Sequence, residues 1–180
     1  MEPDSQRRGF IGCAACWAAS VVLWPGVASS EPTPRALSLP VAPACISSPF
    51  GPRFVPGTRA SLFHTGIDFP APEGAWVHAA APGNVLEIRR LGSAGLIVDL
   101  QHQDRDGQHF VTRYAHLGTI APALENGRRN VATGDALGHI GRSGITYGTH
   151  LHFEVRVAGQ PIDPEPFFAV GRCNRPGATG

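Results

Sequence analysis

Two histidines stand one residue apart near the C-terminal end of the chain, in the segment 149–157. Apolar and polar residues alternate strictly through this segment, which is typical of a strand with one buried face. The apolar face fixes the register, so His150 and His152 point the same way, roughly 6.6–6.8 Å apart along the strand. This spacing suits two zinc ligands, or one ligand beside a catalytic imidazole. The alternative is a pair of histidines on a solvated strand face.

A third histidine precedes an aspartate by four residues, in the segment His64-Thr65-Gly66-Ile67-Asp68. In a fully extended strand the two side chains would lie about 13 Å apart, too far to share one ion. Gly66 can allow the backbone to turn between them, because glycine carries no Cβ. The segment therefore predicts either two ligands of one metal ion or a simple ion pair.

His64, Asp68 and one strand imidazole would leave a fourth tetrahedral position for water, which is typical of a hydrolytic zinc site. The sequence has no His-Glu-x-x-His, so the base is not the glutamate of the helical metalloproteases. An imidazole is then the candidate for moving protons, and His116 is a further histidine on an alternating segment.

Short alternating runs separated by turn residues must position these side chains. Gly and Pro make up 39 of the 180 residues (22 and 17), which favours short strands over long helices. We expect an all-β domain with antiparallel sheets, because the connections are too short for helical crossovers. The predicted strands are 66–69, 76–80, 84–90, 96–102, 109–116, 136–140 and 150–157.

These motifs together resemble the lysostaphin/LytM-type zinc endopeptidases, which cut peptide cross-links in bacterial peptidoglycan. The resemblance covers about residues 45–168, with order and spacing preserved. The matching motifs are Ser48–Phe54, His64–Phe69, Val77–Val85, Tyr114–Leu117, Gly134–Gly138, Gly141–Gly144 and His150–Glu154.

The resemblance implies that His64, Asp68 and His152 hold one Zn²⁺, and that His116 and His150 are the catalytic pair. It also implies antiparallel sheets around an open groove for peptidoglycan stem peptides. Three rival hypotheses are a non-catalytic module that activates a partner cell-wall hydrolase, a sugar-phosphotransferase carrier domain with paired histidines, and a zinc peptidase that acts on proteins. The five matching site residues argue against the first rival.

Three neighbours of these residues carry further expectations. Tyr114 is expected to contact the substrate or an oxyanion. Glu154 lies on the face of His152, either orienting that ligand or as a solvated carboxylate near Arg156. Thr149 stands where the family often has proline, which concerns loop shape more than activity.

The N-terminal residues 1–28 read as a secretory signal peptide of the twin-arginine type, with Arg7-Arg8 before an uncharged run. An uncleaved membrane anchor is the alternative, although Pro25 interrupts the run. We expect an exported protein of the periplasm or cell wall, with no stable membrane span after processing. Residues 29–44 are expected to be a Pro-rich linker, 45–170 the zinc endopeptidase domain and 171–180 a C-terminal tail.

Two cysteines remain after the predicted signal, Cys45 and Cys173. Outside the cytosol they could form a disulfide that ties the two ends of the domain together; two free thiols are the alternative. The formal net charge is +1 and every basic residue is Arg. Near-neutrality argues against nucleic-acid binding, and the lack of Lys excludes Schiff-base or Walker P-loop chemistry. We expect a monomer.

Overall fold

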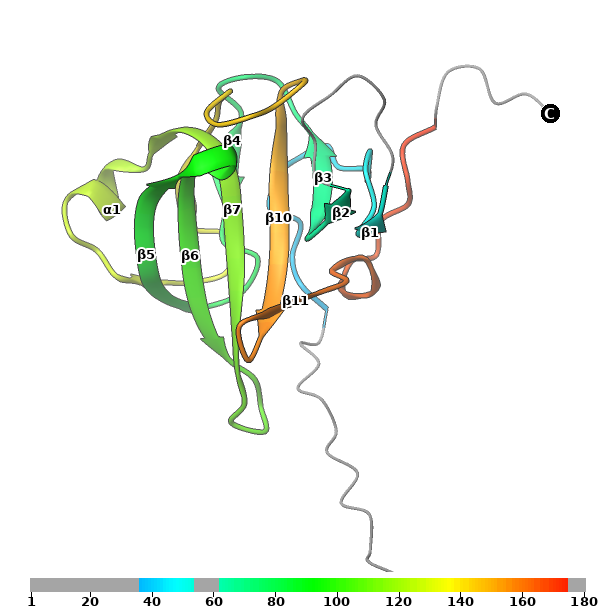
Figure 1. Ribbon diagram of the computed structural model, residues 1–180. Helices are drawn as coiled ribbons and strands as arrows, with labels where there is room; N and C mark the ends of the chain where they lie inside the picture. The colour runs from blue at the N-terminus through cyan, green and yellow to red at the C-terminus, as the bar shows by residue number, and fades with distance from the viewer. Residues whose placement is uncertain (1–35, 54–61, 175–180) are drawn as a thin grey trace, which may run out of the picture. The chain divides into compact units, whose positions relative to one another are not determined.

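The computed structural model describes residues 36–53 and 62–174, which form an all-β domain (Figure 1). Each of the seven predicted strands is present; 136–140 and 150–157 match at both ends, and the ends of the other five differ by at most four residues. The strands are β1 (Gly51–Pro52), β2 (Phe63–His64), β3 (Ile67–Pro70), β4 (Trp76–His78), β5 (Gly83–Leu91), β6 (Gly95–Gln103), β7 (His109–Ile120), β8 (Asn130–Val131), β9 (Ala136–Ile140), β10 (His150–Val157) and β11 (Gln160–Ile162). The helical turns are η1 (Gly92–Ala94), α1 (Pro122–Glu125) and η2 (Glu165–Phe167).

Nine strands form one antiparallel sheet, in which β10 is central to the site. Its main path runs β11-β10-β7-β6-β5-β8; β3 also pairs with β10, and β9 joins β7 to β4. The separate pair β1–β2 lies beside β3 (Figure 1). Strand β10 therefore has β7 along one edge and β3 along the other, with His152 opposite Ala115 and Asp68. The expectation of antiparallel sheets is confirmed.

The alternating pattern of β10 is confirmed by burial. Leu151, Phe153 and Val155 are fully buried, whereas His150 and His152 are only partly covered. Phe153 packs edge-on against aromatic rings from three other segments, those of Phe69, Tyr114 and Phe168. Burial of these apolar side chains holds the register that points both histidines to the opposite face.

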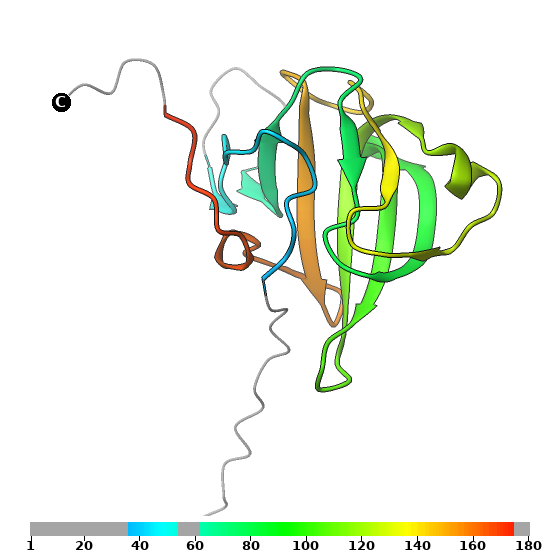
Figure 2. The same ribbon diagram turned by 180° about the vertical axis from the view of Figure 1, so that it is seen from behind.

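The segment 36–44 runs past β3 and β10 on the side of the sheet seen in Figure 2. Leu37 and Val41 belong to the hydrophobic core, and the Leu37 amide donates to the carbonyl of Phe167 (2.8 Å). The expectation that 29–44 is all linker is therefore wrong for 36–44. Two apolar side chains spaced among prolines anchor this segment without forming any periodic pattern.

The two ends of the described domain are joined covalently. Cys45 and Cys173 form a disulfide, with Cα atoms 4.9 Å apart. Ile46 also bridges to Arg172 in parallel register, so backbone pairing supports the bond. The described residues contain no helix capable of spanning a membrane.

Candidate metal centre and catalytic cleft

A cleft of about 630 Å³ opens on the sheet face opposite the segment 36–44. Side chains from β3, β7 and β10 line its floor, and η1 and the β9–β10 loop contribute walls. The exposed apolar side chains Phe63, Ile145 and Tyr147 also line it. A cleft with polar groups converging on its floor and apolar walls is the arrangement expected of a binding site.

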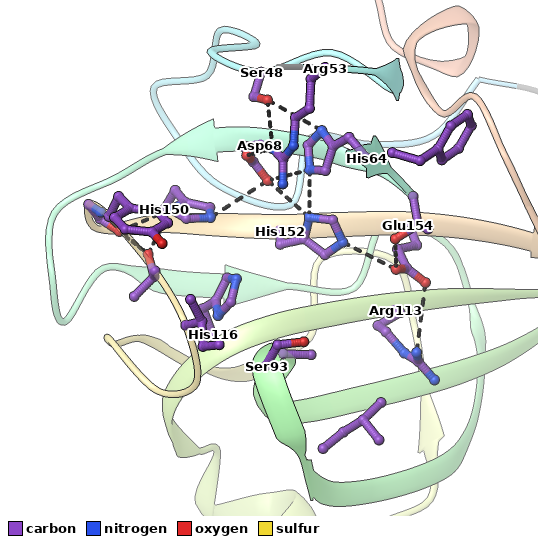
Figure 3. A pocket seen from close by; sticks show the side chains of 18 of the residues that line it. Ser48, Arg53, His64, Asp68, Ser93, Arg113, His116, His150, His152 and Glu154 are labelled. Atoms are coloured by element: carbon purple, nitrogen blue, oxygen red, sulfur yellow. Dashed lines mark hydrogen bonds and ion pairs between the residues drawn. The ribbon is translucent and has the colours of Figure 1, made fainter. Parts of the chain in front are cut away.

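Three ligand-type atoms meet at the floor, as Figure 3 shows. His64 Nε2 lies 3.1 Å from Asp68 Oδ1 and 3.0 Å from His152 Nδ1, and His152 Nδ1 lies 2.9 Å from Asp68 Oδ1. Tetrahedral ligands at Zn–N and Zn–O distances of about 2.0–2.2 Å would be about 3.3–3.5 Å apart. The three atoms are within a few tenths of an ångström of that geometry.

The turn at Gly66 brings His64 and Asp68 together, as the sequence suggested. His64 ends β2 and Asp68 lies in β3, with bends at the two residues between the strands. A Cβ at position 66 would overlap the carbonyl oxygen of Phe153 and lie 3.0 Å from Cε1 of His152. Glycine is therefore required by the close approach of β10.

Hydrogen bonds select the ring nitrogens that face the centre. His64 Nδ1 donates to the carbonyl of Pro49 (2.8 Å), which leaves Nε2 with its lone pair directed at Asp68. His152 Nε2 faces Glu154 Oε1 (3.2 Å), which leaves Nδ1 directed at the centre. Two nitrogen lone pairs and a carboxylate oxygen about 3 Å apart repel one another unless a cation or proton lies among them. The donor set thus fits a Zn²⁺-type ion.

Glu154 is a buried carboxylate that supports His152. It accepts hydrogen bonds from Thr65 Oγ1 (2.6 Å) and Arg156 (2.6 Å), and Arg113 lies 3.8 Å away. Its exposed fraction is 5%. Burial alone would raise its pKa, but the hydrogen bonds from His152 and Thr65 outweigh burial and lower the pKa to about 2. Glu154 is therefore ionised and orients His152, the first of the two expectations for it.

Asp68 and His152 shift the pKa of each other. Burial would raise the pKa of Asp68, but hydrogen bonds from His152 and His64 outweigh it and hold that pKa well below its usual range. Burial would likewise lower the pKa of His152, but Asp68 and Glu154 raise it to about 9. The position between these groups therefore favours positive charge.

His116 projects into the cleft from a strained point of β7. Its φ is +62°, in the left-handed region, where the β6–β7 pairing shifts register between Leu96 and Val98. Its Nδ1 donates to the carbonyl of Ser143 (2.8 Å). Burial, the largest effect, lowers the pKa of His116 to about 4. The ring is thus neutral near pH 7, with Nε2 free to accept a proton.

His150 lies beside His116, with ring centroids 4.9 Å apart. Its Nδ1 donates to the carbonyl of Gly148 (3.0 Å), and its Nε2 is 3.6 Å from Asp68 Oδ1. The two imidazoles form one side of the centre and Glu154 lies on the other (Figure 3). The four predicted site histidines and the aspartate therefore line one cleft: His64, Asp68, His116, His150 and His152.

Tyr114 does not line the cleft, and its expected role as a substrate or oxyanion contact is wrong. Its side chain is fully buried on the opposite face, where its hydroxyl accepts the Ala80 amide (2.8 Å) and lies 3.2 Å from Thr112 Oγ1. Burial raises its pKa to about 12. Alternation through 112–117 placed Tyr114 beside His116, but the register shift in β7 separates them.

Sequence reasoning missed the backbone groups that orient the rings, namely the carbonyls of Pro49, Ser143 and Gly148. Backbone atoms carry no residue-type signal, so only the turn-forming residues around them could point to these contacts. It also left Arg53 without a role; this side chain lines the cleft, 3.2 Å from Ser48 Oγ and 3.8 Å from Asp68 Oδ2.

Known proteins are similar to this chain in both sequence and fold. DD-carboxypeptidase/endopeptidase Mpg of Neisseria meningitidis is 40% identical over 119 residues, which cover 66% of this chain and 26% of that protein. Peptidoglycan DD-endopeptidase ShyA of Vibrio cholerae is 37% identical over 119 residues, with the same coverage of 66% and 26%. The chain thus matches about a quarter of the length of these relatives.

Solved structures superpose on the domain as well. A zinc-containing peptidase from Vibrio cholerae has a TM-score of 0.59 and 33% identity, over 72% of this chain and 39% of that one. The catalytic domain of lysostaphin from Staphylococcus simulans has a TM-score of 0.58 and 26% identity, over 69% and 91%.

The profile of peptidase family M23 matches residues 62–164, more than half of the chain, and this range includes all five converging site residues. The chain belongs to peptidase family M23.

Proposed function

We propose that this protein is an exported, zinc-dependent endopeptidase that hydrolyses peptide cross-links of bacterial peptidoglycan. The observation that carries the proposal is the convergence of His64 Nε2, Asp68 Oδ1 and His152 Nδ1 beside two further imidazoles. The named relatives Mpg and ShyA support peptidoglycan as the substrate class.

The three convergent atoms would hold the ion and leave one side open to the cleft. A zinc ion bound there supplies Lewis-acid chemistry, polarising a scissile carbonyl and lowering the pKa of water toward 7. His64 and His152 enter that site with fixed tautomers, because Pro49 and Glu154 engage their other nitrogens.

His116 and His150 would carry the protons. Both use Nδ1 as a donor to a backbone carbonyl, so both present Nε2 to the cleft. One Nε2 can accept a proton from the attacking water, and the other can donate to the leaving amine or an oxyanion once protonated. The lowered pKa of His116 keeps it in the accepting form near pH 7.

Export is part of the proposal because peptidoglycan lies outside the cytoplasm. The predicted signal peptide, residues 1–28, falls outside the described residues. The Cys45–Cys173 disulfide supports export, since such bonds persist in oxidising compartments. Monomeric state remains a prediction.

The test is digestion of purified peptidoglycan, with the released fragments identified by mass. We expect newly freed stem-peptide termini, no cleavage after chelation, and recovery when zinc is added back. Intact peptidoglycan with a metal-loaded protein would contradict the proposal. Cleavage of unrelated proteins without cell-wall fragments would instead favour a general zinc peptidase.

A further inference from the structure

We propose that Ser143, in the β9–β10 loop, is a positioning residue that fixes the orientation and tautomer of His116. The inference rests on the proposed function, in which His116 moves a proton. Ser143 does this with two groups: its backbone carbonyl accepts from His116 Nδ1, and its hydroxyl ties the loop to the strands that carry His116.

The β6–β7 pairing is irregular at the point where His116 lies. Leu96 pairs with Leu117 and Val98 with Tyr114, so two residues of β7, Ala115 and His116, oppose one residue of β6. Such a bulge re-aims a side chain but weakens the local ladder. The positive φ of His116 adds strain, which persists only where surrounding contacts hold it.

The Ser143 hydroxyl bridges the two strands at this bulge. It accepts from the Leu96 amide (2.8 Å) and donates to the Leu117 carbonyl (2.7 Å). One side chain thereby links β6, β7 and the loop, directly next to His116. Because the same residue supplies the carbonyl that receives His116 Nδ1–H, the hydroxyl determines where that carbonyl lies.

Close backbone contacts lock the loop in this place. The Ile145 amide donates to the Ser93 carbonyl (2.8 Å). A Cβ at Gly95 would overlap Ser143, and a Cβ at Gly144 would overlap Ser93. The close approach of the loop to η1 and to the start of β6 therefore requires glycine at both positions, and the contact leaves little freedom to the carbonyl of Ser143.

A neutral imidazole has one donor nitrogen and one acceptor nitrogen. With Nδ1 held as the donor, Nε2 of His116 must be the acceptor, and the ring lies beside that of His150, with 4.9 Å between the centroids. If the carbonyl shifts, the ring can rotate or exchange tautomers, and the acceptor no longer faces the cleft. We therefore expect Ser143 to affect turnover more than substrate binding.

The experiment compares zinc-loaded Ser143→Ala with the unaltered chain. We expect kcat to fall by about 10- to 100-fold with KM nearly unchanged, because proton transfer is impaired and binding is not. The zinc content should remain unchanged. In ¹⁵N spectra of the imidazoles, assigned by loss of signals in His116→Gln, the single Nδ1–H form should give way to a mixture. Ser143→Thr, which keeps the hydroxyl, should restore both readouts.

Ser38→Ala is the matched control, since Ser38 is exposed and bonds Ala80 through its backbone only. An unchanged His116 spectrum in Ser143→Ala would overturn the proposal, even if stability or kcat fell. If Ser143→Ala does not fold, Ser143→Cys provides the same comparison with a weaker donor. Failure of the unaltered protein to cleave peptidoglycan would contradict the proposed function but leave the spectral comparison valid.

Discussion

His64, His116 and His150 each donate Nδ1 to a backbone carbonyl, whereas His152 uses Nε2 toward the side chain of Glu154. Three rings thus present Nε2 to the cleft and one presents Nδ1. The carbonyl partners are backbone groups, which a side-chain substitution can displace but cannot remove. Glu154 is the exception, so its contribution to the metal centre can be measured directly.

Replacing Glu154 by Gln should weaken zinc binding by about 10-fold or more, within the range typical of partners that orient a ligand. The amide keeps the shape but loses the charge that strengthens His152 as a ligand. Competition with a chromogenic chelator measures the affinity. Glu165→Gln is the control, because Glu165 pairs with Arg172 at the surface. Equal affinities in both variants would contradict this role.

The raised pKa of His152, about 9, predicts that zinc binding releases protons. Below that pH the imidazole of the metal-free protein carries a proton that the ion must displace. At pH 7 binding should release about one proton, and the apparent affinity should rise as pH increases until about 9. Calorimetry in two buffers of different ionisation enthalpy measures the release. No net release at pH 7 would show that His152 is already neutral.

Substitutions should distinguish the proposed zinc ligand His152 from the proposed proton-transferring residue His116. His152→Ala removes a ligand, so we expect loss of both zinc and hydrolysis. His116→Ala should retain zinc and lose about 100-fold or more in kcat, the usual contribution of a proton-transferring group. Metal analysis of the purified variants, alongside cleavage assays, distinguishes them. Retained hydrolysis in His116→Ala would remove that residue from the mechanism.

At the scale of elements, strict alternation correctly predicted which face of the sheet each side chain of β10 occupies, but it failed for β7. One face of β10 is entirely apolar, so its register follows from burial alone. In β7 the polar residues Thr112 and Tyr114 occupy the core face, where their hydroxyls lie close to each other. The bulge then moves His116 to the other side. A bulge depends on pairing with β6 and leaves no pattern in the sequence of β7.

The turn between β2 and β3 gives a test of close packing. Gly66→Ala should lower the free energy of unfolding by about 1–3 kcal/mol, since a methyl group there meets the backbone of Phe153. It should also weaken zinc binding, because His64 and His152 would be pushed apart. Denaturant unfolding and metal titration provide the two measurements.

Gly171→Ala is the matched control for this variant. An added Cβ at Gly171 meets nothing within 4 Å, and its carbonyl still accepts from Ile46. We expect both readouts to remain near those of the unaltered chain. A Gly66→Ala protein with normal zinc affinity would show that the turn tolerates a side chain.

At the scale of the whole domain, the sequence predicted the fold class, the strands and the converging residues, but not the N-terminal limit. The five site residues were predictable because their motifs keep family order and spacing. Residues 36–44 were not, since Leu37 and Val41 are held by long-range contacts with no local period. Apolar side chains between prolines do not distinguish a linker from a segment packed on a core.

The disulfide should contribute strongly to stability. It joins residues 128 positions apart, and closing a loop of that length is worth about 4–5 kcal/mol in the chain-entropy model. The double variant Cys45→Ser/Cys173→Ser should therefore unfold at markedly lower denaturant concentration. Adding a reductant should shift the unaltered protein to the same midpoint and leave the double variant unmoved. Coincident midpoints without reductant would show that the bond does not form.

The Cys45 end of the disulfide also lies close in sequence to residues that contact the proposed metal centre. Ser48, three residues after Cys45, pairs with Asp68. The carbonyl of Pro49, one residue further on, accepts a hydrogen bond from His64 Nδ1. If this short stretch couples the disulfide to the centre, then disulfide formation and metal binding stabilise each other by the same free energy. A bound ion should thus make the Cys45–Cys173 disulfide harder to reduce with dithiols. Reduction of the disulfide should in turn lower the affinity for the ion. If the protein is exported as we propose, oxidation of the two cysteines outside the cytosol would then strengthen metal binding.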